Sequence, residues 1–364
     1  MTGPQRPIAG LIEGVPIAVL VVDARARVIA ANRAAHRLFG DDLVSRPFVT
    51  VLRQPAVVEA LDRVLAPERN PAPVCDPDLP APPDGAVRLR AVIGADGRDL
   101  SAEVTVSLLD GGAMVVVQDR TADEQAEQMR RDFVANVSHE LRSPLTALTG
   151  FIETLRGPAR DDPAARDRFL DIMEREAGRM NRLIHDLLSL SRVQAEGRRR
   201  PSTMVDLPQL LRGVVSTMTP QAQAADMRIE VEGLDGSQRL PGDPDQLVQV
   251  FQNLIENAIK YGGTGGRIRL GLLRIAHEPL LRGPGWAIQV EDFGEGIDEM
   301  HLPRLTERFY RVDTHRSRTQ GGTGLGLAIV KHIVNRHRGR LRVESSKGHG
   351  SRFTVILPET LSRG

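Results

Sequence analysis

The stretch "FVANVSHELRSPLTALTGF", Phe133–Phe151, has the pattern of an amphipathic helix with a histidine on its polar side. At about 100° per residue, the apolar side chains in and just after this stretch share one arc roughly 80° wide. These apolar positions are Val134, Val137, Leu141, Leu145, Leu148, Ile152 and Leu155. His139 lies about 200° from Val137, with Ser143 close to it and Glu140 beside it. The sequence therefore predicts that His139 faces solvent while the opposite face is buried.

Pro144 makes this helix unusual. A solvent-facing histidine on an amphipathic helix is most often only a surface residue. An interior proline, however, costs about 3 kcal/mol or more and usually marks a kink. The proline close after His139 therefore makes the histidine a candidate functional residue, and the rest of the chain must decide between the two interpretations.

The composition excludes several classes of protein. The 48 basic and 47 acidic residues give a formal net charge of +1, so no nucleic-acid partner or anionic membrane surface is expected. Cys75 is the only cysteine, which excludes an intrachain disulfide and suits a reducing compartment. The longest apolar run, Val15–Val22, is far shorter than the ~18 residues that a membrane helix needs. We therefore expect no membrane span in this chain and a soluble, cytoplasmic protein.

Residues 8–120 are expected to form a small α+β sensor domain. Short apolar runs alternate with turn signals, which predicts five strands with a helix or two on one side. The predicted strands are 17–23, 27–32, 87–94, 99–110 and 113–119, with a short helix at 32–40. A proline-dense stretch, Asn70–Asp84, must be an exposed loop or disordered.

Residues 121–196 are expected to form a helical hairpin that dimerises. The charged segment Ala122–Phe133 runs into the opening helix without a breaker, and that helix should end near Gly157–Pro163. A second helix, Ala164–Gln194, has its own apolar side. Two antiparallel helices with one apolar stripe each bury both stripes well only in a four-helix bundle made from two chains. We therefore expect a homodimer.

Residues 203–360 mix helices and strands and carry three candidate binding motifs. In "NLIENAIKY", Asn253, Asn257 and Lys260 share one helical face, where two amides and an ammonium suit a magnesium ion and its phosphates. The polar outer face of an amphipathic helix would show the same pattern. The predicted helices are 206–222, 243–261 and 324–337, and the predicted strands are 227–233, 267–275, 285–294, 340–346 and 351–358.

Two glycine-rich segments add to this pattern. "EDFGEGI" follows a strand, so Gly294 and Gly296 let the backbone pass close to a flat ligand while Asp292 can accept from an exocyclic amine. "GGTGLGLAIVKHI" opens a helix, so bare N–H groups and the helix N-terminus can face phosphate. Neither segment is a Walker sequence or part of a dinucleotide-binding unit.

Together the motifs resemble a sensor histidine kinase of the two-component systems. "NLIENAIKY", "DFGEGI", "ERFYRV", "GTGLGL" and "GHGSRF" match the N, first glycine, F, second glycine and third glycine boxes of the GHKL, or Bergerat-fold, ATPases. "FVANVSHELRSPLTAL" is similar to the H box of these kinases, and "VVDARARVIAANRAAHRLFG" to a PAS domain. The resemblance covers roughly residues 122–358, and the sequences of its motifs are most similar to those of phosphate-regulon sensor kinases. It implies a PAS-like sensor at 8–120, a phosphotransfer hairpin at 121–196 and a GHKL α/β sandwich at 203–360.

The resemblance implies an activity and its cofactors. The protein would transfer the γ-phosphoryl group of ATP, with Mg²⁺, to His139 and then to an aspartate of a response regulator receiver domain. It would also dephosphorylate that regulator, in a pathway of phosphate starvation. Glu140 would take or orient the ring proton of His139, and Ser143 would hold the water for dephosphorylation, where the family usually has Thr or Asn.

The resemblance also assigns the nucleotide site. Asn257 would bind Mg²⁺ with help from Asn253, Asp292 would contact adenine, and Arg308 would reach the γ-phosphate. Residues 313–321 would form a lid over ATP. The full set of implied nucleotide-binding residues is Asn253, Asn257, Lys260, Tyr261, Asp292, Gly294, Gly296, Arg308, Gly322, Gly324, Leu325 and Gly326.

Two other functions fit parts of the pattern. A GHKL ATPase that uses ATP mechanically would lack the H box and would carry a glutamate at the position of Asn253. A degenerate kinase that only binds partners is disfavoured because no motif residue is lost. Most relatives are anchored in a membrane, so the chain is either a soluble member or begins after the anchors.

Overall fold

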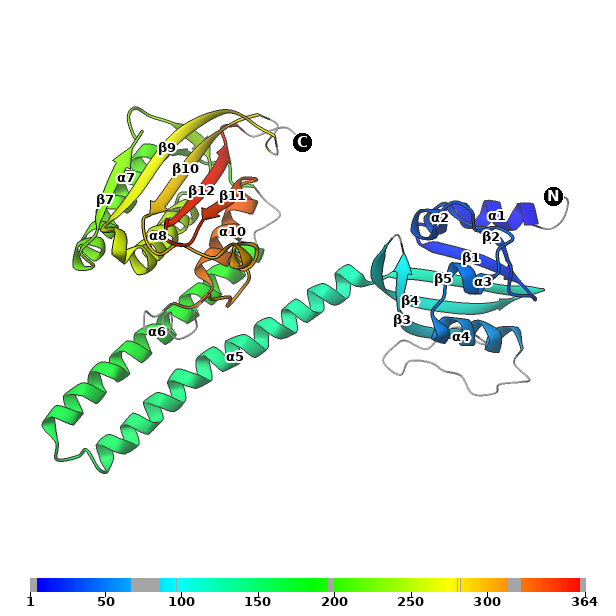
Figure 1. Ribbon diagram of the computed structural model, residues 1–364, viewed down its shortest axis with the longest axis horizontal. Helices are drawn as coiled ribbons and strands as arrows, with labels where there is room; N and C mark the ends of the chain where they lie inside the picture. Colours follow the sequence, from blue (N-terminus) through cyan, green and yellow to red (C-terminus); the bar gives the residue numbers. More distant parts are fainter. Residues whose placement is uncertain are drawn as a thin grey trace. The chain divides into compact units, whose positions relative to one another are not determined.

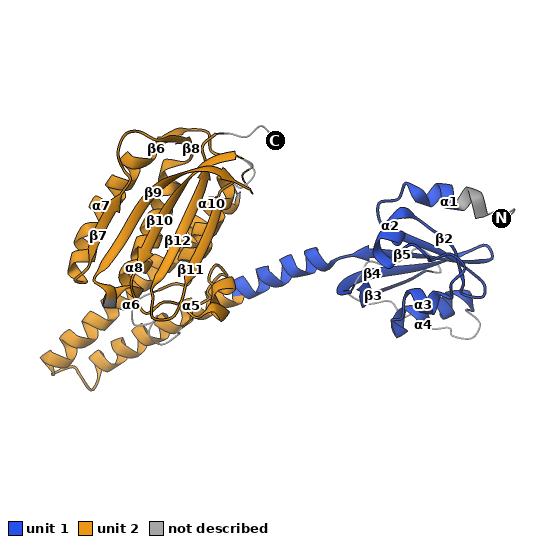
Figure 2. Ribbon diagram, turned by 45° about the horizontal axis from the view of Figure 1, so that its top comes forward, with its two compact units in different colours: residues 1–134 blue, residues 135–364 orange. Residues whose placement is uncertain are grey.

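A computed structural model describes residues 5–66, 86–95, 97–195, 200–279, 281, 283–312 and 322–360 (Figure 1). The chain divides into two compact units, residues 1–134 and 135–364 (Figure 2). The predicted loop at 70–84 and the predicted lid at 313–321 lie outside the described residues. The three domain ranges drawn from the sequence stay predictions.

The first unit contains one antiparallel sheet of five strands in the order β2-β1-β5-β4-β3. Its strands are β1 (Ala18–Asp23), β2 (Val28–Ala31), β3 (Val87–Ala95), β4 (Arg98–Leu109) and β5 (Gly112–Asp119). Its helices are α1 (Gln5–Glu13), α2 (Arg33–Phe39), α3 (Phe48–Val51) and α4 (Pro55–Leu65). The five predicted strands and the predicted short helix are confirmed within a few residues. Helices α1, α3 and α4 were not named from the sequence.

Both faces of the sheet in the first unit are covered. Leu20 and Val22 face a core shared with α2, α3 and α4, while Val19 and Val21 pack with Ile12 of α1 on the other face. Strand side chains alternate between faces, so the uninterrupted run "VLVV" is explained by burial on both sides. The prediction of helices on one side only was therefore incomplete.

Two long helices, α5 (Thr121–Arg156) and α6 (Pro163–Ala195), form the predicted hairpin. α5 continues through Pro144, which is its only fully buried residue among those described, and the bend predicted there stays a prediction. The rings of Phe151 and Phe169 stack across the hairpin at 5.3 Å between centroids. Along the same hairpin Leu145 is 56% exposed and Ile152 is 44% exposed. Part of the apolar stripe therefore has no partner within the described part of this chain.

In the described ranges, the rest of the second unit is an α/β sandwich in which helices pack against a five-stranded sheet (Figure 2). The sheet order is β11-β12-β10-β9-β7, antiparallel except for the β7–β9 pair. Its elements are α7 (Leu207–Ala224), β7 (Arg228–Glu232), α8 (Pro244–Tyr261), β9 (Arg267–Glu278), β10 (Gly283–Asp292), α10 (Gly326–Arg336), β11 (Arg340–Ser345) and β12 (Ser351–Pro358). These match the elements predicted from the sequence. The fold class is confirmed.

Four further short elements among the described residues of this unit were not predicted. β6 (Met204–Asp206) and β8 (Arg239–Pro241) pair as a separate two-stranded sheet. Two 3₁₀ turns, Gly263–Gly265 and Glu299–Arg304, follow α8 and β10. Elements of three to six residues are too short for a periodic pattern to show.

Candidate active site

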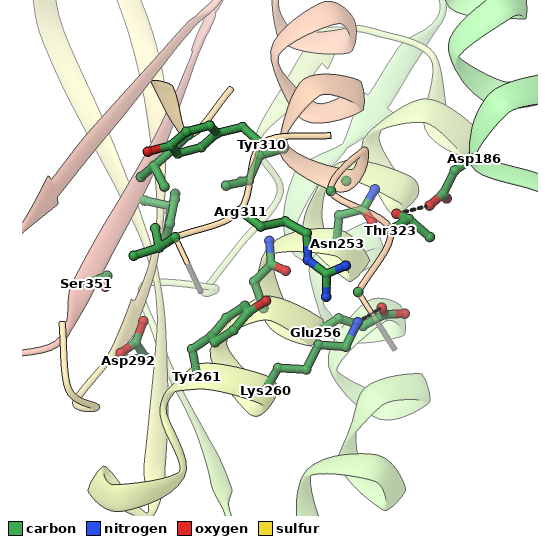
Figure 3. Close-up of a pocket in the computed structure, with 18 of the residues that line it drawn as sticks. Asp186, Asn253, Glu256, Lys260, Tyr261, Asp292, Tyr310, Arg311, Thr323 and Ser351 are labelled. Atoms are coloured by element: carbon green, nitrogen blue, oxygen red, sulfur yellow. Dashed lines mark hydrogen bonds and ion pairs between the residues drawn. The ribbon is translucent and has the colours of Figure 1, made fainter. Parts of the chain in front are cut away.

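A cavity of about 850 Å³ lies in the second unit where α8, the end of β10, the loop before α10 and α6 meet (Figure 3). Nine of the twelve implied nucleotide-binding residues line it: Asn253, Asn257, Lys260, Tyr261, Asp292, Gly296, Gly322, Gly324 and Gly326. Residues from α6 to β12 surround it, so segments far apart in the sequence meet around one space. The sequence motifs form a single site.

Helix α8 turns its polar face toward the cavity because its apolar face is buried in the sandwich. The Asp243 side chain accepts from the backbone N–H of Gln246 and caps the helix, and Pro244 occupies its first turn. Leu254 and Ile255 are fully buried on the inner face. Their burial fixes the rotation of the helix, so the asparagines of the N box must point outward.

Lys260 is already paired within the site. Its Nζ lies 3.3 Å from Oε2 of Glu256 one turn earlier, and both side chains are partly exposed. Figure 3 shows this pair facing the cavity below Arg311. A phosphate that binds here would have to share or replace the Glu256 carboxylate as the partner of the ammonium.

Asp292 lies at the end of β10 and is almost completely shielded from solvent. The residue is 4% exposed, and its carboxylate accepts from the backbone N–H of Gly294 at 3.0 Å and from Ser351. Burial is the main cause that raises the pKa of Asp292 above its usual range, and these hydrogen bonds oppose the shift. A fixed, desolvated carboxylate of this kind is a strong and selective acceptor for a ligand amine.

Two glycines at the cavity are required by the backbone itself. Gly296 has φ +67°, and a Cβ there would overlap the carbonyl oxygen of Ser346. Gly324 has φ +72°, and a Cβ there would lie 2.9 Å from the backbone of Phe309. The glycine boxes therefore serve chain packing as well as the close approach to a ligand that the sequence predicted.

Three implied residues do not line the cavity. Gly294 packs against the backbone at the end of α8, and Leu325 is fully buried in the core. Arg308 is half-buried outside the lining, whereas Arg311, three residues later, extends into the cavity (Figure 3). Phe309 between them has φ +63°, and this left-handed backbone turns the chain so that the two arginine side chains point in different directions.

Helix α6 forms one side of the cavity, which the sequence analysis did not foresee. Asn181, Arg182, His185 and Asp186 all line it. Oγ1 of Thr323 donates to the carboxylate of Asp186 at 2.7 Å, and Ser189 donates to Gln249 of α8 at 2.8 Å. The four lining residues share one helical face by their spacing, a signal that the apolar stripe of this helix obscured.

The predicted phosphoacceptor segment lies apart from the described lining of the cavity. His139 and Ser143 are exposed on α5, and neither is among the described residues that surround the cavity. Glu140 pairs with Arg179 of α6 at 2.6 Å, and the arginine side chain is only 12% exposed. Glu140 is thus held by the second helix of the hairpin.

The donor set fits Mg²⁺ as a ligand of the nucleotide more than as a protein-caged ion. Within the described residues, no group of three or more His, Cys, Asp and Glu side chains could hold a metal ion. The amide oxygens of Asn253 and Asn257 remain as hard oxygen donors at the cavity. Mg²⁺ commonly takes one or two protein ligands and completes its shell with phosphate and water.

Three family models match this chain. Residues 8–71 match the PAS domain, residues 129–196 the His Kinase A (phospho-acceptor) domain, and residues 242–361 the histidine kinase-, DNA gyrase B- and HSP90-like ATPase. None of the helices in the described ranges is long and apolar enough to cross a membrane.

Curated relatives extend the likeness. The chain is 37% identical over 340 residues to the phosphate regulon sensor protein PhoR of Pseudomonas aeruginosa, covering 93% of this chain and 71% of PhoR. It is 37% identical over 254 residues to the sensor protein kinase WalK of Staphylococcus saprophyticus, covering 70% of this chain. The chain spans only 40% of the length of that WalK.

Solved structures of histidine kinases are also similar. ThkA, in a crystal structure with the response regulator protein TrrA, is 19% identical with a TM-score of 0.49 and covers 98% of this chain and 99% of ThkA. AdeS of Acinetobacter baumannii is 24% identical with a TM-score of 0.46 and covers 61% of this chain and 98% of AdeS.

Proposed function

Because this chain belongs to the sensor histidine kinases that join PAS, His Kinase A and ATPase domains, we propose that it phosphorylates His139 from ATP. One observation carries the proposal. The boxes of the ATPase domain converge on one cavity, while the H-box histidine stands exposed on α5 where a phosphoryl donor and then a receiver domain can reach it.

The reaction needs a neutral imidazole and an acceptor for its ring proton. One ring nitrogen of His139 attacks the γ-phosphorus, the bond from that phosphorus to the bridging oxygen breaks, and ADP leaves. The proton on the other ring nitrogen passes to the Glu140 carboxylate or to water. A neutral imidazole is abundant at pH 7, which makes it a suitable nucleophile. The ion pair with Arg179 holds the Glu140 side chain in place next to the acceptor.

The nucleotide would lie with adenine at Asp292 and its phosphates toward Lys260 and α10. The carboxylate of Asp292 accepts from the exocyclic amine, and the backbone N–H groups at the start of α10 face the phosphates. When bound by the amide oxygens of Asn257 and Asn253, Mg²⁺ would neutralise charge on the triphosphate. Of Arg308 and Arg311, it is Arg311 that lines the cavity, so we assign it the phosphate contact.

The same hairpin would serve dimerisation and the response regulator. The exposed apolar residues of α5 and α6, among them Leu145 and Leu188, support a homodimer built as a four-helix bundle. The phosphoramidate of His139 is reactive enough to transfer its group to an aspartate of a receiver domain. Ser143 would then hold the water that removes the group, one turn from the histidine.

The signalling pathway is proposed from the likeness to PhoR. The 37% identity over 93% of the chain supports a role in the response to phosphate starvation. A panel of labelled receiver domains tests it. The regulator of a phosphate regulon should receive the phosphoryl group faster than a receiver domain from a cell-wall pathway. Equal rates would contradict this assignment and would leave the kinase activity intact.

Autophosphorylation is tested with radioactive Mg-ATP. The full chain should gain label that is labile in acid and stable in alkali, because a P–N bond hydrolyses in acid. His139→Gln should lose the label and still bind ATP, whereas Asn257→Ala should lose both. Asp245→Ala, at an exposed position of α8 that does not line the cavity, is the control and should keep the label. Full label on His139→Gln would overturn the proposal.

A further inference from the structure

The cavity has two ends with different charges. Asp292 lies at one end beside Ser351, and Asp186 lies at the other, above Lys260 and Glu256 (Figure 3). Glu256, Lys260 and His185 lie near Asp186, whereas Glu291 precedes Asp292 in the chain. The two aspartates therefore belong to separate electrostatic environments within one cavity.

The proposed orientation of the nucleotide assigns a role to each end. With adenine on Asp292, the phosphate chain runs away from β10, past Lys260, toward α6. The third phosphate, which distinguishes ATP from ADP, then comes closest to the end that holds Asp186. This step rests on the proposed function, since it takes Asp292 as the adenine contact.

Hydrogen bonds fix the Asp186 carboxylate in place. Oγ1 of Thr323 donates to it at 2.7 Å, and the backbone N–H of Leu325 donates to the same Oγ1 at 3.3 Å. The carboxylate is thereby tied to the loop that leads into α10. Burial is the main cause that raises the pKa of Asp186, and the Thr323 hydrogen bond opposes it. The group has lost much of its water, so a nearby negative charge interacts with it strongly.

We propose that Asp186 is a specificity-determining residue that makes the site, with α6 against it, favour ADP over ATP. Arg182 and Arg311 also line the cavity and attract the phosphates of both nucleotides. The difference between the nucleotides depends on the group that meets the third phosphate. A fixed carboxylate at that position repels it, and Glu256 already occupies the Lys260 ammonium that would offset this repulsion.

A consequence concerns α6. ATP can bind fully only when α6 withdraws its carboxylate, so binding of ATP and release of α6 are coupled, whereas ADP leaves α6 in place. The contacts that would break are the hydrogen bonds of Asp186 with Thr323 and of Ser189 with Gln249. After transfer to His139, the product ADP would restore the closed arrangement.

Calorimetric titration with Mg-ADP and Mg-ATP tests the proposal on the full chain carrying His139→Gln, which prevents turnover. The chain should bind ADP about tenfold more tightly than ATP. Asp186→Asn keeps an acceptor for Thr323 and removes the charge, so ATP should gain about tenfold while ADP changes little. Asp186→Glu keeps the charge and should preserve the preference. Ser189→Ala removes a contact that ATP binding breaks and ADP binding keeps, so ATP should gain affinity modestly while ADP changes little.

Amide hydrogen exchange gives a second readout, which does not require the Asp186→Asn variant to fold well. Exchange in residues 181–189 should rise with Mg-ATP and stay unchanged with Mg-ADP. An unchanged affinity ratio in Asp186→Asn, or an equal shift of both nucleotides, would overturn the proposal and leave Asp186 a structural residue. Failure of every variant to bind either nucleotide would overturn the proposed function as well.

Discussion

His139 on α5 and His185 on α6 lie in regions of opposite character. His139 stands exposed on the hairpin surface, beside a Glu140 that Arg179 holds. His185 lines the cavity together with Asp186. Proximity to the cavity alone would indicate His185 as the acceptor, whereas the surrounding motif indicates His139. The comparison shows that the proposed donor site and the proposed acceptor surface must be identified by different features, the first by its cavity and the second by its motif.

Residues at the cavity also contribute to folding, whereas the exposed residues of the hairpin surface do not. Gly296 is fitted against backbone, so a side chain there would disturb folding and binding together. His139 and Ser143 contact mainly solvent, so their roles can be removed while the fold persists. An acceptor that serves both ATP and a receiver domain must stay accessible. We infer that the ATP-binding part moves relative to α5 during transfer.

The largest effect should come from a charge on the apolar hairpin surface. Leu145→Asp would place an unpaired carboxylate from each chain in the proposed bundle, and burial of such a charge is strongly unfavourable. We expect dimer affinity to fall about a thousandfold with little loss of folding, because Leu145 is 56% exposed in one chain. Light scattering after size-exclusion chromatography measures the mass. Leu108→Asp, at 58% exposure on β4, is the control, and equal masses for both variants would refute a dimer through α5.

Next in size is the effect of the aspartate at the end of β10. Asp292→Ala removes the proposed acceptor for adenine, and loss of a hydrogen bond to a charged group should weaken ATP binding about a hundredfold. The thermal midpoint of unfolding should not fall together with the affinity, because the variant also removes the unfavourable burial of a carboxylate. Asp298→Ala, exposed near the same loop, should bind ATP as the wild type does. Wild-type affinity in Asp292→Ala would remove this residue from the site.

Ser143 gives a smaller and more selective effect. Ser143→Ala should slow dephosphorylation of the regulator about tenfold and leave autophosphorylation unchanged, because only the hydroxyl that places the water is lost. Ser143→Thr should hold or raise the rate. Within the described hairpin, hydroxyls that bond back to carbonyls include Thr149 and Thr154. Thr149→Ala is therefore the matched control, and an equal slowing in both variants would leave Ser143 with a structural role.

The smallest effect concerns stability and pH. Folding raises the pKa of Asp186 through burial, so the stabilisation from its protonated form is present at low pH and is lost as pH rises through the folded pKa. At pH 7 the ionised group is therefore unfavourable, and Asp186→Asn should raise the midpoint of unfolding by about 2 °C. The gain should vanish as pH falls below the ordinary aspartate value of 3.8. A gain that is constant with pH would contradict the burial argument.

Local patterns predicted most of the fold and most of the cavity. The strands of the first unit and the boxes of the second have side-chain periods or glycines that show in a single sequence. Which of Arg308 and Arg311 lines the cavity could not be predicted, because Phe309 between them has a left-handed backbone that no local pattern indicates. The side of the cavity that α6 forms depends on contacts between distant segments, such as Thr323 with Asp186. No local pattern encodes such contacts.

The most direct test of the account is the position of the phosphoryl group. The full chain is incubated with Mg-ATP at neutral pH, digested and analysed by mass spectrometry under conditions that preserve phosphohistidine. The phosphoryl group should map to the peptide that contains His139, persist in His185→Gln and disappear in His139→Gln. A phosphoryl group on His185, retained in His139→Gln, would contradict the account.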